Sequence, residues 1–263
     1  MSVFTKDCLK GRVAFITGGG SGICKGIARA FLEHGGKVFI TSRSEERLSA
    51  AAAELRDQTG GEVDFSACDV REGEQVERAM GTCLETLGGL DIVVNGAAGN
   101  FLSPAAGLSY NGFKTVMAID TLGTYNVSKA AFMAGLRETG GVILNISATL
   151  HYTGVPLQVH AGCAKAANDA MTRHLAVEWG PAGIRVNGIA PGPVAGTEGV
   201  RRLVGAGFKE KIEAEVPLGR FAQISEICDA ALFLASDAAR FITGEVLVVD
   251  GGAWMTAGSL SKA

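Results

Sequence analysis

The chain has 263 residues, of which 47% are hydrophobic and 19% charged, and its formal net charge is −3. This composition excludes an intrinsically disordered chain, and without a block of Lys or Arg it offers no electrostatic face for nucleic acid or a membrane surface. No apolar run approaches the roughly 20 residues that a membrane-spanning helix needs.

Cysteine and histidine usage narrows the function classes further. The six cysteines include no Cys-x-x-Cys pair, which favours reduced thiols and a reducing compartment. The four histidines are scattered, so no metal site is predicted. The first ten residues carry Lys6, Asp7 and Lys10 without an apolar stretch, and we expect no signal peptide.

Short apolar runs alternate with helical patterns along the chain. The predicted strands are residues 13–17, 37–42, 63–69, 90–95, 141–147, 185–190 and 246–249. The predicted helices are residues 23–34, 44–58 (with Ser44 as its cap), 74–87, 109–135 (one helix or two), 161–179 and 225–235.

Strands that alternate with helices form right-handed crossovers in a mostly parallel sheet, and strands that are apolar throughout are covered on both faces. The sequence therefore predicts an α/β fold. We expect a single domain over residues 1–263, a Rossmann-type doubly wound parallel sheet of about seven strands with helices on both faces. The charged segment 197–216 interrupts the pattern and is predicted to form a lid over the substrate.

A glycine cluster follows the first predicted strand, where residues 17–24 read Thr-Gly-Gly-Gly-Ser-Gly-Ile-Cys. Glycines in such a turn let the backbone approach a pyrophosphate, and the following helix offers unpaired N–H groups and a positive dipole end. An ordinary loop could also hold glycines, but the position at the first strand–helix turn favours phosphate binding. The predicted contacts are Gly18, Gly19, Gly20, Ser21, Gly22 and Ile23.

The end of the second strand predicts which dinucleotide is bound. NAD sites usually place an acidic residue there to hold the ribose 2′-hydroxyl, and this chain has none. Arg43 stands at that point and can pair bidentately with a 2′-phosphate, while Ser42, Ser44 and Arg47 add donors. The alternative is that Arg43 is a solvated surface residue. A cation where the acid is missing predicts NADPH as the cofactor.

Residues 17–24 resemble the Thr-Gly-x-x-x-Gly-x-Gly motif of the short-chain dehydrogenase/reductase family, with the small residue Cys24 in place of the last glycine. Segments 68–70, 95–99, 191–193 and 250–252 are similar to further motifs of that family in their usual order. The resemblance implies that the cofactor is also contacted by Asp69, Asn95, Ala97, Lys165, Pro191, Gly192 and Thr197.

The predicted active site departs from the family pattern of Asn, Ser, Tyr and Lys. Only the lysine is kept, as Lys165. Ala161 stands where the tyrosine would be, Ala148 where the serine would be, and Asp120 where the asparagine would be. A ketone reductase without both hydroxyls would lack its proton donor, so either the protein is inactive or its chemistry differs.

Longer segments resemble one branch of the family, the peroxisomal 2,4-dienoyl-CoA reductases: residues 95–102, 113–117, 157–162, 170–180 and 196–199. That branch uses NADPH to reduce a 2,4-dienoyl-CoA to a 3-enoyl-CoA. Hydride adds to the distal end of the conjugated thioester, the oxygen of the resulting dienolate is stabilised, and a carbon is protonated. The resemblance implies Lys165 and Asp120 as the catalytic residues, although an Asp beside a Lys is equally a structural ion pair.

The same resemblance implies an acyl-CoA as partner. The residues it assigns to the substrate are Arg43, Arg71, Phe101, Ser109, Tyr110, Asn111 and Arg202. For Arg71 and Arg202, the sequence is equally compatible with an ordinary solvated surface charge and with substrate binding. The missing hydroxyls also leave open a reductase of another acyl or carbonyl substrate and a catalytically silent NADP-binding protein.

Four more polar residues lie near the predicted site. Tyr152 is either a donor or a packed tyrosine, His151 is next to it, and His160 caps or packs at the start of its helix. Asp169 lies four residues after Lys165 on the same helix face and is expected to pair with it.

Assembly and location complete the predictions. Helix 161–179 is rich in small residues on more than one face, which favours a homotetramer or homodimer. Ser261-Lys262-Ala263 resembles the peroxisomal Ser-Lys-Leu address with its last residue replaced. This favours a peroxisomal location in a eukaryote and a cytoplasmic one otherwise.

Overall fold

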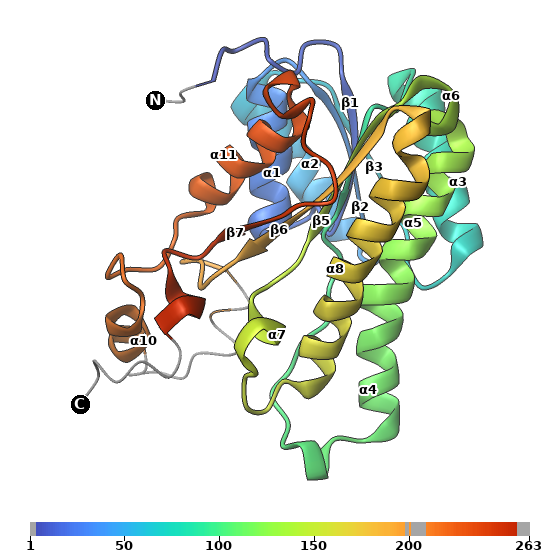
Figure 1. Ribbon diagram of the computed structural model, residues 1–263. Coiled ribbons are helices and arrows are strands. Elements are labelled where there is room, and N and C mark those ends of the chain that lie inside the picture. The colour runs from blue at the N-terminus through green and yellow to red at the C-terminus, as the bar shows by residue number, and fades with distance from the viewer. Residues whose placement is uncertain (1–3, 198–199, 201–208, 257–263) are drawn as a thin grey trace.

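The computed structural model describes residues 4–197, 200 and 209–256 (Figure 1). Within them, seven strands form one parallel sheet in the order β3-β2-β1-β4-β5-β6-β7. The strands are β1 (Val13–Thr17), β2 (Lys37–Ser42), β3 (Val63–Ala67), β4 (Ile92–Asn95), β5 (Gly141–Ile146), β6 (Ile184–Pro191) and β7 (Val246–Val249). The predicted doubly wound, Rossmann-type fold is confirmed.

The α-helices connect these strands as the alternating pattern predicts. They are α1 (Gly22–Glu33), α2 (Glu45–Thr59), α3 (Gly73–Leu87), α4 (Tyr110–Met117), α5 (Gly123–Ala131), α6 (Arg137–Thr139), α7 (Leu150–Thr153), α8 (Val159–Trp179), α10 (Lys209–Glu215) and α11 (Ile224–Ala235). The short helix α7 was not predicted, because four residues carry no periodic signal.

The sheet is buried on both faces, and two apolar clusters fill the space beneath the helices. On one face α1, α2 and α11 pack over Ile16 of β1 and Ile40 of β2. On the other, α3, α5 and α8 pack over their neighbours Phe15 and Phe39, whose rings stack 5.5 Å apart (Figure 1). Successive strand residues point to opposite faces, so one continuous apolar run supplies both clusters.

Two helix starts show how local sequence fixes the element boundaries. Ser44 caps α2 as predicted, because its hydroxyl accepts a hydrogen bond from the Arg47 N–H at 3.3 Å. Helix α11 begins one residue earlier than expected. Gln223 is its cap, in a reciprocal capping box with Glu226.

The predicted helix over residues 109–135 is divided by a change of helical pitch. Helix α4 ends at Met117, residues Ala118–Leu122 form a π-helical segment, and α5 follows. A π segment shifts the register of the side chains and is frequent at functional sites. Asp120 lies inside it and is only 1% exposed, so the shift carries a carboxylate into the interior.

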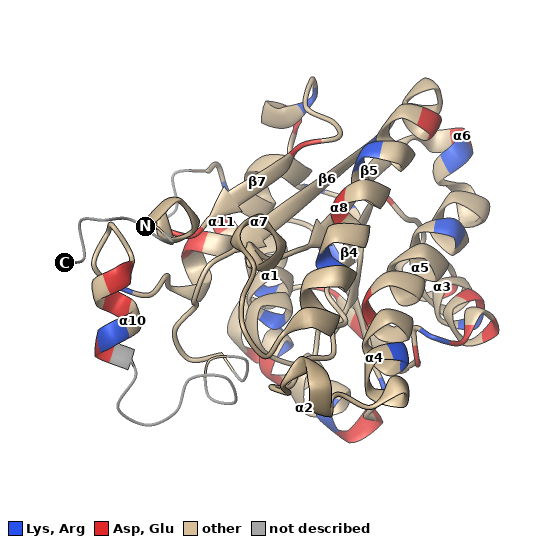
Figure 2. Cartoon of the chain, turned by 60° about the horizontal axis from the view of Figure 1, so that its bottom comes forward, with Lys and Arg blue, Asp and Glu red and all other residues tan. Residues whose placement is uncertain are grey.

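Some predictions lie outside the described residues. Arg202, half of segment 197–216 and the tail 261–263 belong to this group; the described end of the predicted lid is α10. Among the described residues, no helix is long and apolar enough to cross a membrane and no acidic, His and Cys side chains cluster as metal ligands would. In the view of Figure 2, basic and acidic residues are interspersed along the helices.

Candidate active site

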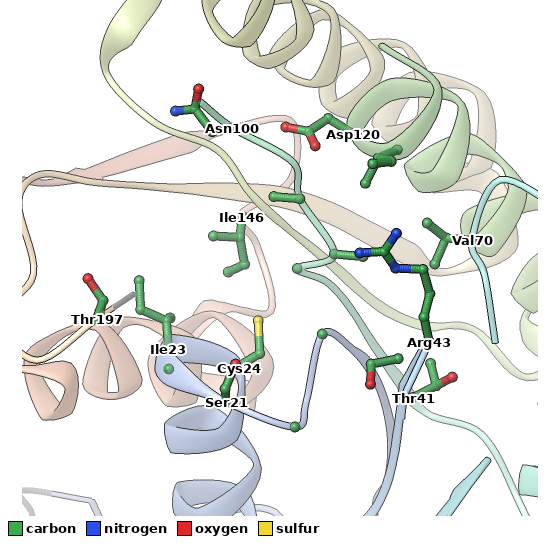
Figure 3. Close-up of a pocket in the computed structure, with 18 of the residues that line it drawn as sticks. Ser21, Ile23, Cys24, Thr41, Arg43, Val70, Asn100, Asp120, Ile146 and Thr197 are labelled. Carbon is green, nitrogen blue, oxygen red and sulfur yellow. The ribbon is translucent and has the colours of Figure 1, made fainter. Parts of the chain in front are cut away.

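A cleft of about 480 Å³ opens where the carboxyl ends of β1 and β4 meet. The strand order changes direction at this point, and in open α/β sheets the crevice at such a point is where ligands bind. The loops after β1 to β5, helix α8 and Thr197 line the cleft, and Figure 3 shows the side chains that face into it.

The glycine loop after β1 forms one wall of the cleft. Gly18 and Gly22 have left-handed backbones, with φ of 71° and 57°, which favours glycine there. A Cβ on Gly22 would meet no atom within 4 Å, so the backbone faces open space. Ser21 caps α1 without a side-chain hydrogen bond, and the first-turn N–H groups of a helix have no partner inside it. The loop fits a pyrophosphate.

The structure places five predicted cofactor residues outside the lining of the cleft: Gly19, Ser44, Asn95, Pro191 and Gly192. A Cβ on Gly19 would lie 2.6 Å from Cγ2 of Ile40, so this glycine allows the loop to pack on β2. A Cβ on Gly192 would lie 2.6 Å from Cβ of Asp250, so the 191–193 and 250–252 motifs pack on each other.

Asn95 joins three elements beneath the cleft. Its side-chain amide donates to Oγ of Ser128 at 3.0 Å and to Oδ1 of Asn145 at 2.9 Å. These bonds tie the end of β4 to α5 and β5. The geometry gives Asn95 a supporting position below the cleft floor.

The far end of the cleft carries the positive charge that the sequence predicts. Arg43 and Arg47 both line it, and in Figure 3 the Arg43 guanidinium points into the cavity. Ser42 also lines it, and its Oγ is buried without a hydrogen-bond partner in the described part of the chain. Two arginines and an unpartnered hydroxyl at one end of a cleft fit a phosphate group.

Arg71 lies differently. Its Nε donates to Oδ1 and Oδ2 of Asp69 at 2.9 and 3.0 Å. These hydrogen bonds lower the pKa of the Asp69 carboxyl below its ordinary value, so the pair is charged near neutral pH. Asp69 lines the cleft, whereas Arg71 holds Asp69 and does not line it.

Lys165 reaches the centre of the cleft from α8. Its Nζ donates to the backbone oxygen of Ile146 at 2.9 Å and lies 3.3 Å from Oδ2 of Asp120. Oδ1 of Asp120 accepts the Gly99 N–H at 2.7 Å. Both side chains are buried, so the π-helical segment supplies the countercharge that a buried ammonium requires. An ammonium has three donors, of which one is used in the hydrogen bond to Ile146.

Both expected hydroxyl positions carry methyl groups in this cleft. Ala148 and Ala161 line it beside Lys165, at the places where the family pattern has serine and tyrosine. Ala161 is one helical turn before Lys165 on α8. The space that a tyrosine ring would fill is therefore free for a ligand.

Asp169, the next residue on this face of α8, does not pair with Lys165, and that expectation was wrong. Oδ1 of Asp169 accepts from Ser147, and Oδ2 accepts from His151 Nε2 at 2.8 Å and from the Tyr152 hydroxyl at 3.3 Å. Lys165 instead pairs with Asp120, which lines the cleft, whereas Asp169 does not.

The Asp169 cluster keeps Tyr152 protonated. Burial, together with the charge of Asp169, raises the pKa of Tyr152 to about 12. Its ring packs edge-on against His151 and Trp254. Tyr152 is thus a packed tyrosine whose hydroxyl donates to Asp169.

The predicted substrate residues Phe101, Ser109, Tyr110 and Asn111 lie outside the lining of the cleft. Phe101 directly follows the lining residue Asn100. The Phe101 ring stacks on His160 with centroids 4.4 Å apart, and Nε2 of His160 donates to the Phe101 carbonyl at 2.9 Å. A Cβ on Gly112 would lie 3.1 Å from the Phe101 ring, so the start of α4, with Ser109, Tyr110 and Asn111, lies beside it. Of these, Ser109 caps α4 and Tyr110 is exposed.

Several lining residues were given no role of their own in the sequence analysis. Four of them lie in the motif segments 68–70 and 95–99, namely Cys68, Val70, Gly96 and Ala98, and the others are Thr41, Asn100, Ile119, Ile146, Ser147 and Leu150. Five of these ten lie within one residue of a strand end, which was the available signal: Thr41, Cys68, Gly96, Ile146 and Ser147. Asn100 donates to Oε1 of Gln158 at 2.7 Å, a contact across 58 residues that no local pattern predicts.

The fold and this cleft together define a dinucleotide-binding oxidoreductase. A sequence model described as Enoyl-(Acyl carrier protein) reductase matches residues 18–253. The chain belongs to the short-chain dehydrogenase/reductase family.

Individual relatives are similar over nearly the whole chain. A peroxisomal 2,4-dienoyl-CoA reductase [(3E)-enoyl-CoA-producing] of Danio rerio is 54% identical, over 97% of this chain and 85% of its own. One of Saccharomyces cerevisiae is 45% identical, over 94% and 86%. A gluconate 5-dehydrogenase from Burkholderia cenocepacia, solved with NADP and tartrate, has a TM-score of 0.88 and 32% identity, covering 94% of this chain and 98% of its own.

The Asp169 cluster predicts a large effect on stability. Asp169→Ala removes the acceptor of three hydrogen bonds and leaves buried donors unpaired, so the free energy of unfolding should fall by about 2–4 kcal/mol. Urea unfolding followed by circular dichroism measures it. Asp229→Ala, at an exposed position of α11, is the matched control and should change stability by less than about 0.5 kcal/mol. Equal effects of the two variants would contradict the cluster's role.

Proposed function

We propose that this chain catalyses the NADPH-dependent reduction of a 2,4-dienoyl-CoA to a 3-enoyl-CoA. The observation that carries the proposal is a nicotinamide-type cleft that keeps its lysine, Lys165, but has methyl groups at both hydroxyl positions, Ala148 and Ala161. Such a site suits a substrate that is protonated on carbon. The relatives at 45–54% identity carry this activity in their names.

Residues of the cleft would hold NADPH along its length. The loop Gly18–Ile23 would bind the pyrophosphate, Arg43 with Ser42 and Arg47 the 2′-phosphate, and Lys165 the nicotinamide ribose. Thr197, Asp69 and Ala97 also line this path. When bound, the reduced nicotinamide supplies the hydride.

Residues of the chain would stabilise the negative charge that develops on the substrate during the reaction. Hydride addition at the distal carbon moves an electron pair to the thioester oxygen, and a proton must reach the carbon next to the thioester. The Lys165 ammonium, with donors left over from its hydrogen bond to Ile146, would stabilise negative charge in the cleft. Asp120 pairs with that ammonium and accepts the Gly99 N–H. We propose that its carboxylate takes up a proton from solvent and passes it to this carbon.

The substrate would enter from the side of the cleft on which Phe101 and the start of α4 lie. Phe101 and the start of α4 at Ser109, Tyr110 and Asn111 would line the acyl channel, since they lie together beside the cleft. The family resemblance proposes Arg43, Arg71 and Arg202 for the phosphates of the acyl-CoA, but Arg71 does not line the cleft and Arg43 is the residue proposed here for the 2′-phosphate. The names of the relatives support a peroxisomal location if the source is eukaryotic.

A second candidate function is a catalytically silent NADP-binding protein. The same two alanines favour it, because a carbonyl reductase stripped of serine and tyrosine would have this cleft. The two candidates differ in whether any acyl-CoA is turned over.

We further propose that the chain forms a homodimer or homotetramer through α8 and its neighbours. Val177 of α8 is 81% exposed. Further exposed apolar side chains lie on or beside α4 and α5, at Tyr110, Phe113, Leu122, Tyr125 and Met133. Exposed apolar side chains on neighbouring helices support a subunit interface on this side of the sheet.

Turnover tests the proposed reaction. NADPH oxidation should be observed with a 2,4-dienoyl-CoA and be negligible with a 2-enoyl-CoA or a 3-oxoacyl-CoA of the same chain length. Asp120→Ala should lower kcat by about 10²–10⁴ with a small change in NADPH affinity, because the loss falls on the chemical step. Stopped-flow absorbance of the reduced nicotinamide separates the two quantities.

The control for this prediction is a variant that places a tyrosine at position 161, where the family pattern has one. Ala161→Tyr should not accelerate dienoyl-CoA reduction, since the ring would fill substrate space. A large acceleration with 3-oxoacyl-CoA would instead identify a degraded carbonyl reductase. No turnover with any thioester by a protein that binds NADPH would favour the silent candidate. Full kcat in Asp120→Ala would make the aspartate structural.

Cofactor preference depends on Arg43. Arg43→Ala should weaken NADPH binding by about 1–3 kcal/mol and leave NADH binding nearly unchanged, because only NADPH carries the 2′-phosphate. Titration of nicotinamide fluorescence measures both. Arg56→Ala, on α2 but outside the cleft lining, is the control. Equal affinity of the parent protein for the two cofactors would contradict this assignment.

Assembly depends on the exposed face of α8. Val177→Glu places a charge in the proposed interface and should shift the protein toward smaller species in sedimentation velocity at micromolar concentration. Glu178→Ala, at the neighbouring position, should leave the distribution unchanged. A parent protein that sediments as a monomer would refute the proposal.

A further inference from the structure

Two residues from separate motif segments meet in the wall of the cleft. Cys24 replaces the last glycine of the loop motif, and Gly96 is the second residue of the 95–99 segment. Both residues line the cleft. A Cβ built on Gly96 would lie 2.0 Å from Sγ of Cys24, far inside contact distance. The thiol therefore occupies the space that any side chain at position 96 would need.

The two segments that carry these residues are in close backbone contact. The hydroxyl oxygen of Thr17 accepts the N–H groups of Gly96 and Ala97 at 3.0 and 3.1 Å. A Cβ on Gly18 would lie 3.0 Å from the Gly96 carbonyl oxygen. The separation between the glycine loop and the 95–99 segment is thus set closely by what fills the space between them.

The 95–99 segment extends from the glycine loop to the centre of the site. Ala97 and Ala98 line the cleft, and the Gly99 N–H ends the segment on Oδ1 of Asp120 at 2.7 Å. Asp120 in turn lies 3.3 Å from Lys165 Nζ. A displacement of Gly96 would therefore move the cleft wall and the carboxylate that holds the lysine.

We propose that Cys24 and Gly96 are a complementary pair, in which the thiol acts as a positioning residue that seats the 95–99 segment against the glycine loop. Cys24 acts through its volume. The thiol is only 6% exposed, and burial raises its pKa to about 12, so it stays neutral and does not serve as a nucleophile. The pair is expected to be coupled: each position decides which residue the other tolerates.

The distances supply a graded test. Cys24→Ala deletes the sulfur and leaves a hole beneath Gly96. Gly96→Ala drives a methyl group into the sulfur. In Cys24→Ala/Gly96→Ala the two Cβ atoms would lie 3.6 Å apart, an ordinary contact, and the new methyl would need the Thr17 carbonyl, at 3.1 Å, to give only slightly. The double variant should therefore undo the damage of the Gly96 substitution.

The experiment is a double-mutant cycle measured by NADPH fluorescence titration, by kcat at saturating NADPH and by thermal unfolding. We expect Gly96→Ala to weaken NADPH binding by at least about tenfold, which is about 1.4 kcal/mol. Cys24→Ala should weaken it by about two- to threefold, and the double variant should bind within about twofold of Cys24→Ala. Such rescue is not expected from two independent structural defects.

Two controls isolate the pair from general effects of the substitutions. Cys83→Ala removes a buried thiol of α3 outside the cleft lining, and Gly81→Ala adds a Cβ that would meet no atom within 4 Å. Neither should change NADPH affinity.

Losses that multiply in the double variant would overturn the proposal. The Gly96→Ala variant could fail to fold. In that case a double variant that folds supports the coupling. A double variant that does not fold, while Cys24→Ala does fold, contradicts the coupling. NADPH binding needs no acyl-CoA, so an inactive parent protein that binds NADPH would defeat the proposed reaction and leave this test intact. The thermal midpoints report the same coupling if NADPH does not bind.

Discussion

The site depends on one hydroxyl group, that of Thr17, which joins the ends of the neighbouring strands β1 and β4. The chain segments that follow these two strands lead to opposite faces of the sheet. After β1 the chain turns to helix α1 on one face of the sheet, whereas after β4 it turns toward the opposite face. Thr17, at the end of β1, accepts two N–H groups of the segment after β4. Because the oxygen is only 3.0–3.1 Å from both, the two walls of the cleft are held at a defined separation. Polar groups that would be orphaned at a strand end are satisfied by the same contact.

Helix α8 supplies three residues one turn apart with three different environments. Ala161 leaves room, Lys165 carries charge, and Asp169 collects hydrogen bonds from a neighbouring loop. Helical spacing makes these residues neighbours, but their partners come from other elements. Asp120 of the π-helical segment pairs with Lys165, and Ser147, which follows β5, donates to Asp169. A buried lysine without its tyrosine still needs a countercharge, and Asp120 in place of asparagine provides it.

The cationic end of the cleft shows that similar side chains can have unlike roles. Arg43 points into the cavity beside an unpartnered hydroxyl of the described chain, while Arg71 is held by the Asp69 carboxylate. A guanidinium already bound by a carboxylate offers less of its donor set to a phosphate, and its contribution to an acyl-CoA depends on the donors that remain. The Arg43 guanidinium is therefore the stronger anchor for a 2′-phosphate.

The sequence by itself determined the alternating architecture, the phosphate loop, the cationic end and the two missing hydroxyl groups, because periodicity and motif spacing are local properties of the chain. Only the tertiary structure decided which of these residues face the cleft. Gly19 packs on β2, and Asp169 turns from Lys165 to His151 and Tyr152. The complementarity of Cys24 and Gly96 was likewise invisible, since these residues are far apart in the chain and meet only when β1 and β4 are neighbours. Which buried groups bind one another depends on their distance in space. That distance is set by the assembled sheet and cannot be read from the order of residues along the chain.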